Sequence, residues 1–196
     1  MEITNFDEFQ YFVNYTNSNG RYLDSANNNR IDSSPFQNCI NLEYIVLPPN
    51  IFNIALSFLA NTKISKILIP KSVGLCDVAT FKNCVNLTSI VFEDGGDVPL
   101  YVGGDMWLEN TQVTILVLPF KTYRIRGYWR RGSNLNTLYV KSTIPPILEH
   151  GWGDNPDTCD LYVPIGCKEV YASATNWGSF RTITEYDFDL NPNNVH

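Results

Sequence analysis

Histidine, cysteine and serine are the residues from which a nucleophilic active site is usually built, and this chain has few histidines. Only His150 and His196 occur. His150 lies in a stretch rich in glycine and aspartate before Trp152, and nothing around it resembles the sharp turn that presents a nucleophile. The cysteines include no Cys-x-x-Cys pair, and no ligand spacing is typical of zinc. The sequence therefore predicts no catalytic centre, no metal centre and no cofactor.

Two acidic stretches carry carboxylates that are able to bind calcium through oxygen ligands. They contain Glu93, Asp94, Asp97 and Asp105 in the first, and Asp154 and Asp157 in the second. Neither stretch has the spacing of an EF-hand or an RTX repeat. A pair of carboxylates can also supply the acid and base of a glycosidase, but the separation this needs is not visible in a sequence. We interpret both stretches as polar turns, with calcium binding as the alternative.

A third segment, residues 121–131, combines five cations with aromatic side chains and contains no acid. Its members are Lys121, Tyr123, Arg124, Arg126, Tyr128, Trp129, Arg130 and Arg131. Such a basic-aromatic segment can bind acidic surfaces, sulfated or sialylated glycans, or phosphates through ion pairs and cation–π contacts. The alternative is a solvated turn in which Trp129 belongs to the core. The chain as a whole carries a net charge of −6, which argues against nucleic acid as a partner.

These segments lie within a sequence phrase that recurs along the chain. An aromatic residue opens each copy, an asparagine follows in the first four, and a short apolar stretch ends most copies at a proline. The opening residues are Phe36, Phe58, Phe81, Trp107 and Trp129, at spacings of 22, 23, 26 and 22 residues. An insert at residues 93–97 accounts for the spacing of 26. A period in the twenties predicts a solenoid whose repeats stack around one continuous core. The opening residues should form a single buried column.

Within each repeat, the apolar stretch predicts a short β-strand. In the first copy Ile45 and Leu47 should point inward, Tyr44 and Val46 outward, and Pro48 should end the pairing. Equivalent strands should then stack as parallel neighbours about 4.8 Å apart. We expect irregular or short helical segments to return the chain to the next opening residue. The predicted fold class is therefore a leucine-rich-repeat type of solenoid, mainly β.

The outward positions of these strands form a mostly apolar row. Its members are Val46, Leu68, Val91, Val117, Tyr139 and Tyr162, and the neighbouring row contains Tyr44, Lys66, Ser89, Ile115, Thr137 and Asp160. An exposed apolar row on a flat sheet is a natural docking surface. The alternative is ordinary β-propensity, with neighbours stacking along the sheet. Because the basic-aromatic segment follows the fourth strand, we expect it to rim one edge of this sheet.

The chain reads as one domain of 196 residues with a cap at each end. We predict an N-terminal cap and loop over residues 1–35, about five repeats over 36–157, and a sixth strand with a C-terminal cap over 158–196. Within the caps we expect a helix at residues 4–15 with Thr4 and Asp7 in a capping box, a loop at 14–34, a helix at 166–176 and a last strand at 181–188.

Five cysteines are spread along the repeats: Cys39, Cys76, Cys84, Cys159 and Cys167. Cys39 and Cys84 occupy the same repeat position, so we interpret the cysteines as unpaired thiols that fill core columns. Disulfides or a metal site are the alternative. No stretch approaches the roughly 20 apolar residues of a membrane helix, so membrane insertion is not expected. The first eight residues are acidic and polar, unlike a signal peptide. We therefore expect that the mature chain begins here, that export uses another route, or that the protein is never exported alone.

The phrase from Phe36 to Ile51 and its copy from Phe81 to Ile90 resemble the BspA-like leucine-rich repeats, a type found in bacterial surface proteins and some protists. The copy from Phe58 to Val73 matches with Asn61 and Thr62 around the cysteine position, and tryptophans open the next two copies. The ending from Leu161 to Phe180 looks like the terminal cap of Bacteroides-type members. The resemblance covers nearly the whole chain and brings no catalytic residues with it.

The resemblance implies adhesion or protein binding. We expect a non-enzymatic module that binds a protein or glycan, in adhesion or in host or partner recognition, through the outward row and the basic-aromatic segment. The alternative is a phage tail or capsid-associated component that docks on other virion or surface subunits. The expected location is accordingly a cell surface, the extracellular space or a virion.

Overall fold

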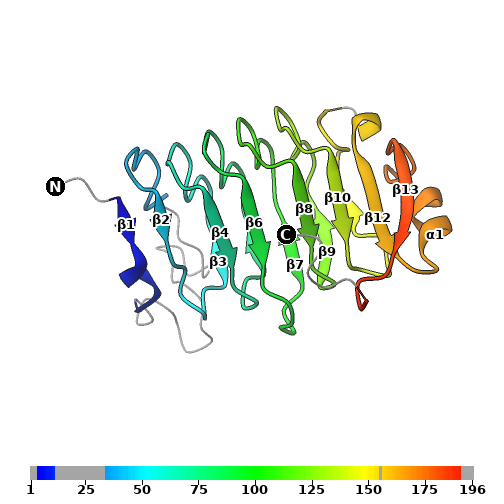
Figure 1. Cartoon of the computed structure of the whole chain (residues 1–196), viewed down its shortest axis with the longest axis horizontal. Coiled ribbons are helices and arrows are strands. Elements are labelled where there is room, and N and C mark those ends of the chain that lie inside the picture. Colours follow the sequence, from blue (N-terminus) through cyan, green and yellow to red (C-terminus); the bar gives the residue numbers. More distant parts are fainter. Residues whose placement is uncertain (1–3, 12–33, 155, 191–196) are drawn as a thin grey trace.

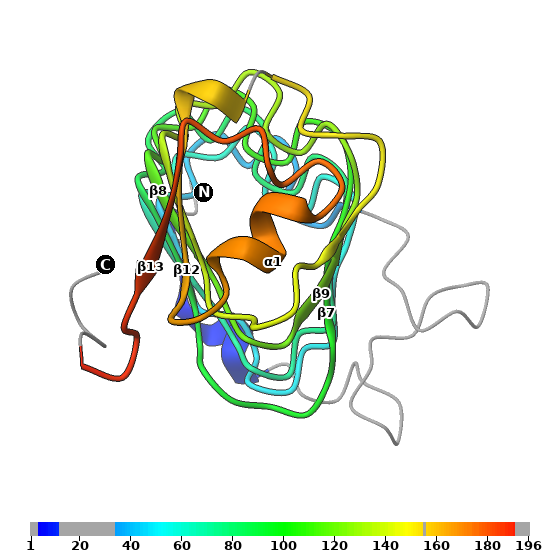
Figure 2. The same ribbon diagram turned by 90° about the vertical axis from the view of Figure 1, so that its right-hand side faces the viewer.

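The computed structural model describes residues 4–11, 34–154 and 156–190. In this part the chain winds into a stack of flattened coils, and most coils contribute one strand to each of two facing sheets (Figure 1, Figure 2). All strand pairs are parallel. The predicted solenoid of leucine-rich-repeat type is confirmed.

The sheet nearest the viewer in Figure 1, which we call the front sheet, contains the strands that the repeats predict. They are β2 (Tyr44–Ile45), β4 (Lys66–Ile69), β6 (Ser89–Phe92), β8 (Ile115–Leu118), β10 (Thr137–Val140) and β12 (Asp160–Pro164). Within this layer β4 pairs with β6, and β8, β10 and β12 pair in turn, whereas β2 and β4, and β6 and β8, lie side by side without ladder pairing. Ile45 and Leu47 are buried, while Tyr44 and Val46 are exposed and half-buried respectively. The predicted alternation is therefore confirmed in the first repeat, and β4 repeats it.

The returning segments form a second sheet, the back sheet, where we had expected irregular or short helical chain. Its strands are β3 (Asn53–Ile54), β5 (Leu75–Cys76), β7 (Leu100–Val102), β9 (Thr122–Ile125) and β11 (Ile147–Leu148). Ile54, Cys76, Val102, Ile125 and Leu148 point inward and are buried. Strands as short as two residues show no alternation in a sequence. They form here because each one pairs with its copy in the next repeat.

The opening aromatic residues form the expected column between the two sheets. Phe58, Phe81, Trp107 and Trp129 are fully buried, and Phe36 is half-buried against the same core. The column continues into Trp152, whose ring centroid lies 5.6 Å from that of Trp129. Trp152 is thus a further opening residue, 23 residues after Trp129, beyond the five that the sequence predicts.

The asparagines of the phrase form a second column on the edge of the stack. Asn38, Asn61, Asn83 and Asn110 all have positive φ, between 58° and 64°, a backbone conformation that asparagine tolerates better than most residues. The side-chain amides of Asn61, Asn83 and Asn110 each donate to the side-chain oxygen of the preceding asparagine, at 2.7, 2.8 and 2.8 Å. We call this column the asparagine ladder. It ties neighbouring repeats together at the turn that follows each opening residue.

The N-terminal cap differs from the predicted helix at residues 4–15. Its described part is a strand, β1 (Asn5–Phe6), followed by a 3-10 helix, η1 (Asp7–Tyr11). The Asn5 side chain accepts the Asp7 amide, and β1 pairs with β2, so the chain here extends the front sheet. Phe6 and Phe9 then pack on Phe36 and cover the first repeat. Residues 12–15 and all but the last of the predicted loop at 14–34 lie outside the described residues.

The C-terminal cap contains the predicted helix and strand in shorter form. After η3 (Pro156–Thr158) and β12, α1 (Lys168–Ser173) lies across the end of the core (Figure 2), and Tyr171 of this helix is buried. β13 (Thr182–Tyr186) then pairs with β12 as the last strand of the front sheet.

All five cysteines are free thiols, and four of them are buried as predicted. Cys39 is the exception, since it is exposed. The equivalent Cys84 packs on the preceding repeat, where its sulfur lies 3.4 Å from the Thr62 hydroxyl and 3.1 Å from the Leu59 carbonyl oxygen. Cys39 belongs to the first repeat, and no earlier repeat covers it among the described residues.

The thiols should therefore differ in reactivity. Cys39 should be alkylated fast in the native protein. The other four should react slowly, because burial removes access and raises the pKa of Cys84 and, to about 11, that of Cys159. Iodoacetamide labelling followed by peptide mass spectrometry measures both rates, and Cys39→Ser should remove the fast phase. Fewer than five reactive thiols after denaturation without reductant would contradict this assignment.

Candidate functional site

The residues that are able to do acid–base or metal chemistry are dispersed in the structure. His150 is exposed in a turn with a φ of 61°. Within residues 4–11, 34–154 and 156–190, no group of three or more metal-ligating side chains occurs.

The acidic stretches act as polar turns. Glu93 accepts the Lys71 backbone amide at 2.9 Å, and Asp94 pairs with Lys141 at 2.7 Å. Asp154 accepts the backbone amide of Gly132. These carboxylates hold neighbouring turns together, as the interpretation from the sequence expects.

The outward row lies on the outer face of the front sheet, which we call the front face. Leu68 is 55% exposed, and Val46, Val91, Val117, Tyr139 and Tyr162 are half-buried. In the neighbouring row Ile115 and Tyr44 are 46% and 40% exposed. A shallow groove of about 310 Å³ crosses β2, β4 and β6 between these side chains. The N-terminal half of the front face is thus apolar and open to solvent.

The C-terminal half of the front face is aromatic. Tyr139 and Tyr162 stack with ring centroids 4.5 Å apart, and Tyr186 and Phe188 pack edge-on against Tyr139. Desolvation by these neighbours, and then the proximity of the other two hydroxyls, raises the pKa of Tyr139. Tyr186 and Phe188 could not be assigned to this surface from the sequence, because their place depends on the register of β13 against β12. Together the four rings form an aromatic patch, and β8 lies between this patch and the groove.

The basic-aromatic segment does not rim the front sheet. Its residues Tyr123 and Arg124 belong to β9, which is a strand of the back sheet. The expectation was wrong because the return of the fourth repeat is itself a strand, so the chain has already crossed to the other sheet. The two surfaces that we expected to act together therefore lie on opposite faces of the solenoid (Figure 2).

Two cations of this segment are used inside the protein. Lys121 is buried and donates from Nζ to the carbonyl oxygens of Lys71 and Val73. Desolvation lowers its pKa, against the opposing influence of Cys76 and Glu93. Arg130 is 3% exposed and donates to the Leu135 carbonyl at 2.8 Å. Neither charge is available to a partner at the surface.

The remaining members of the segment are divided between pairing and exposure. Arg124 forms an ion pair with Glu149 at 3.4 Å, and Trp129 belongs to the core column. Exposed side chains remain at Tyr123, Arg126, Tyr128 and Arg131. The positive patch that the sequence suggests is therefore much smaller in the folded protein.

Comparison with known proteins agrees with this geometry. The family model of the BspA type leucine rich repeat region matches residues 10–136 in six copies. The chain belongs to the BspA-type leucine-rich repeat family. The resemblance seen in the sequence is thereby confirmed, and the family supports a role in protein interaction. No curated protein matches the chain.

Among solved structures, this BspA-type protein is similar to a leucine-rich repeat protein from Bacteroides ovatus. The two are 14% identical, with a TM-score of 0.31, over 77% of this chain and 50% of the other. The chain thus spans about half the length of that protein. Among the described residues, no helix is long and apolar enough to cross a membrane.

Proposed function

We propose that this BspA-type protein is a non-enzymatic binding module whose front face binds an extended segment of a partner protein. The observation that carries the proposal is the continuous apolar row from Val46 to Tyr162. Leu68 in this row is 55% exposed, and Ile115 in the neighbouring row is 46% exposed. Soluble proteins rarely expose a contiguous apolar surface of this kind unless something binds there. We further propose that this binding serves recognition at a cell surface, because adhesion is what the family resemblance implies.

The dimensions of the row favour an extended peptide segment. Six strands at about 4.8 Å spacing give a row of about 24 Å, which about seven extended residues can follow. The groove over β2, β4 and β6 would bind the apolar side chains of the segment. The stacked rings of Tyr139 and Tyr162 would contact its other end. Charged side chains are sparse along the row, with Lys66 near one end and Asp160 paired to Arg181 near the other. Affinity should therefore depend little on salt.

Selection from a library of random linear peptides tests this proposal. Peptides selected on the parent protein should be rich in apolar residues, and Leu68→Asp should weaken their binding at least about tenfold, because it places a charge in the centre of the groove. Leu56→Asp is the matched control, since Leu56 is 41% exposed on a turn away from the front face. Arg126→Glu should also leave binding unchanged. The measurement is fluorescence anisotropy, with folding checked by circular dichroism.

Equal binding by the parent and Leu68→Asp would place the binding surface elsewhere. Loss of binding in Arg126→Glu instead would assign it to the back sheet. A selection that yields no apolar peptides, from a library that yields binders to other proteins, would also contradict the proposal.

A further inference from the structure

The edge at which the chain passes from the front sheet to the back sheet has turns of unequal length. In the fourth repeat, β8 and β9 are joined by residues 119–121 alone. The turns on either side are longer, with residues 93–99 between β6 and β7 and residues 141–146 between β10 and β11. Because the turns leave the front sheet at equivalent positions of stacked strands, a short turn between two long ones projects less and leaves a hollow. We call this hollow the turn pocket.

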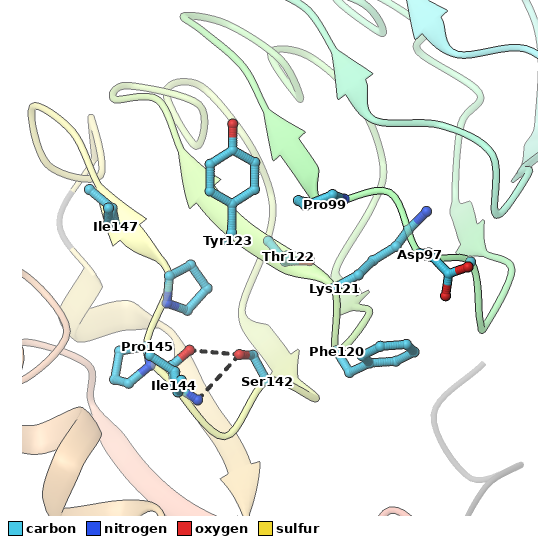
Figure 3. A pocket seen from close by; sticks show the side chains of 12 residues that line it. Asp97, Pro99, Phe120, Lys121, Thr122, Tyr123, Ser142, Ile144, Pro145 and Ile147 are labelled. Carbon is cyan, nitrogen blue, oxygen red and sulfur yellow. Dashed lines mark hydrogen bonds between the residues drawn. The ribbon is translucent and has the colours of Figure 1, made fainter. Parts of the chain in front are cut away.

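The turn pocket has a volume of about 600 Å³ and is lined mainly by apolar side chains. Figure 3 shows Asp97, Pro99 and Phe120 on one side, Ile144, Pro145 and Ile147 on the other, and Tyr123 between them. Phe120, Ile144 and Ile147 are 54%, 76% and 56% exposed. Large apolar side chains grouped around a concavity are typical of binding sites.

Interactions within the turns hold the two walls in place. The ion pair of Asp94 with Lys141 spans the fourth repeat and joins the two long turns. On one wall the Ser142 hydroxyl donates to the Ile144 carbonyl at 2.6 Å and accepts the Ile144 amide at 3.3 Å. Prolines in both walls restrict the backbone further. A preformed pocket loses little conformational entropy when a ligand binds.

The charged residues that line this pocket are Asp97 and Lys121. The Lys121 ammonium group turns away from solvent to the carbonyl oxygens of Lys71 and Val73. Asp97 is exposed in the wall, and no hydrogen bond or ion pair of its carboxylate is found within the described part of the chain. The protein as a whole carries −6. A cationic group on a ligand would therefore find the Asp97 carboxylate unpaired by any described residue, while the Lys121 ammonium group is held by backbone carbonyl oxygens.

We propose that the turn pocket is a second protein-binding site, which takes a proline or branched aliphatic side chain of a partner segment that has a lysine or arginine next to it. The apolar side chain would enter between Phe120 and Ile144 and pack on Tyr123, and the basic residue would pair with Asp97. Extended, proline-containing segments usually bind grooves lined by aromatic side chains, and Phe120 and Tyr123 supply the aromatic rings here. The site is separate from the front face and does not depend on it.

Two blocked peptides test the proposal, acetyl-Ala-Pro-Leu-Pro-Arg-Ala-amide and the same peptide with glutamate in place of arginine. Titration of the full chain followed by amide chemical shifts should show changes at Phe120, Tyr123, Ile144 and Ile147. The arginine peptide should bind about threefold more tightly than the glutamate peptide, as expected for one exposed ion pair. Asp97→Asn should remove this difference, and Asp105→Asn, another exposed acid, should preserve it.

Ile144→Asp tests the apolar contact. Its matched control is Ile165→Asp, because Ile165 is 62% exposed and lies outside the pocket. Ile144→Asp should weaken the arginine peptide at least about tenfold, and the control should leave binding unchanged. Shifts that map to the front face, equal binding of both peptides, or no binding at the highest soluble concentration would each overturn the proposal.

Discussion

Replacement of Phe58 by alanine should destabilise the protein more than any other single change considered for this chain. Phe58 is fully buried, with its ring centroid 5.3 Å from that of Phe36 and 6.2 Å from that of Phe9. Removal of a buried phenylalanine side chain costs roughly 3–5 kcal/mol, against a total stability of about 5–15 kcal/mol for a typical domain. The melting temperature should therefore fall by roughly 6–20 °C, as measured by circular dichroism.

Phe120→Ala is the matched control for this change. Its side chain is 54% exposed, so the same truncation should change the melting temperature by only a few degrees. A melting temperature of Phe58→Ala equal to that of the parent would contradict the repeat register, because Phe58, Phe81, Trp107 and Trp129 are assigned to the aromatic column from the same phrase.

The second large effect is expected for Asn83→Ala in the asparagine ladder. Asn83 donates to Asn61 at 2.8 Å and accepts from Asn110 at 2.8 Å, and its φ is 59°. Each lost hydrogen bond costs about 0.5–1.5 kcal/mol, and alanine in the left-handed region adds about 1 kcal/mol. Together these changes should lower the free energy of unfolding by about 2–4 kcal/mol, as measured by urea denaturation.

Asn83→Gly separates the two causes. Glycine adopts positive φ without strain but offers no side-chain amide. This variant should therefore lose the hydrogen bonds alone and lie between the parent and Asn83→Ala in stability. If Asn83→Gly were the less stable of the two, the left-handed conformation would not be the reason that asparagine occurs here.

Most of the fold could be predicted from the sequence. The predictable part consists of contacts between equivalent positions in successive repeats. In a stacked repeat, the neighbour of a side chain is the same position in the next repeat. The spacing of Phe58, Phe81 and Trp107 therefore determined a buried aromatic column, and the Leu-x-x-Ile-x-Leu pattern determined the strands of the front sheet. The outward row followed for the same reason, since alternation along a strand assigns each residue to one face.

What the sequence did not reveal are contacts between positions that are not equivalent. Lys121 reaches across to the carbonyl oxygens of Lys71 and Val73, far along the chain. Its neighbour in the sequence, Phe120, remains exposed. The alternation of inward and outward residues could not predict that Lys121 is buried and Phe120 exposed, because both outcomes depend on how far each turn projects.

The sequence by itself thus determined the repeat period, the core columns, the front sheet and the family. Tertiary structure alone decided that the short returns pair as a back sheet, that the basic-aromatic segment lies opposite the outward row, and that a short turn between two long ones forms a pocket. The physical reason is that a repeat pattern encodes one coil and its stacking. The orientation of a charged side chain and the depth of a turn are instead set by the atoms that surround them in the folded protein.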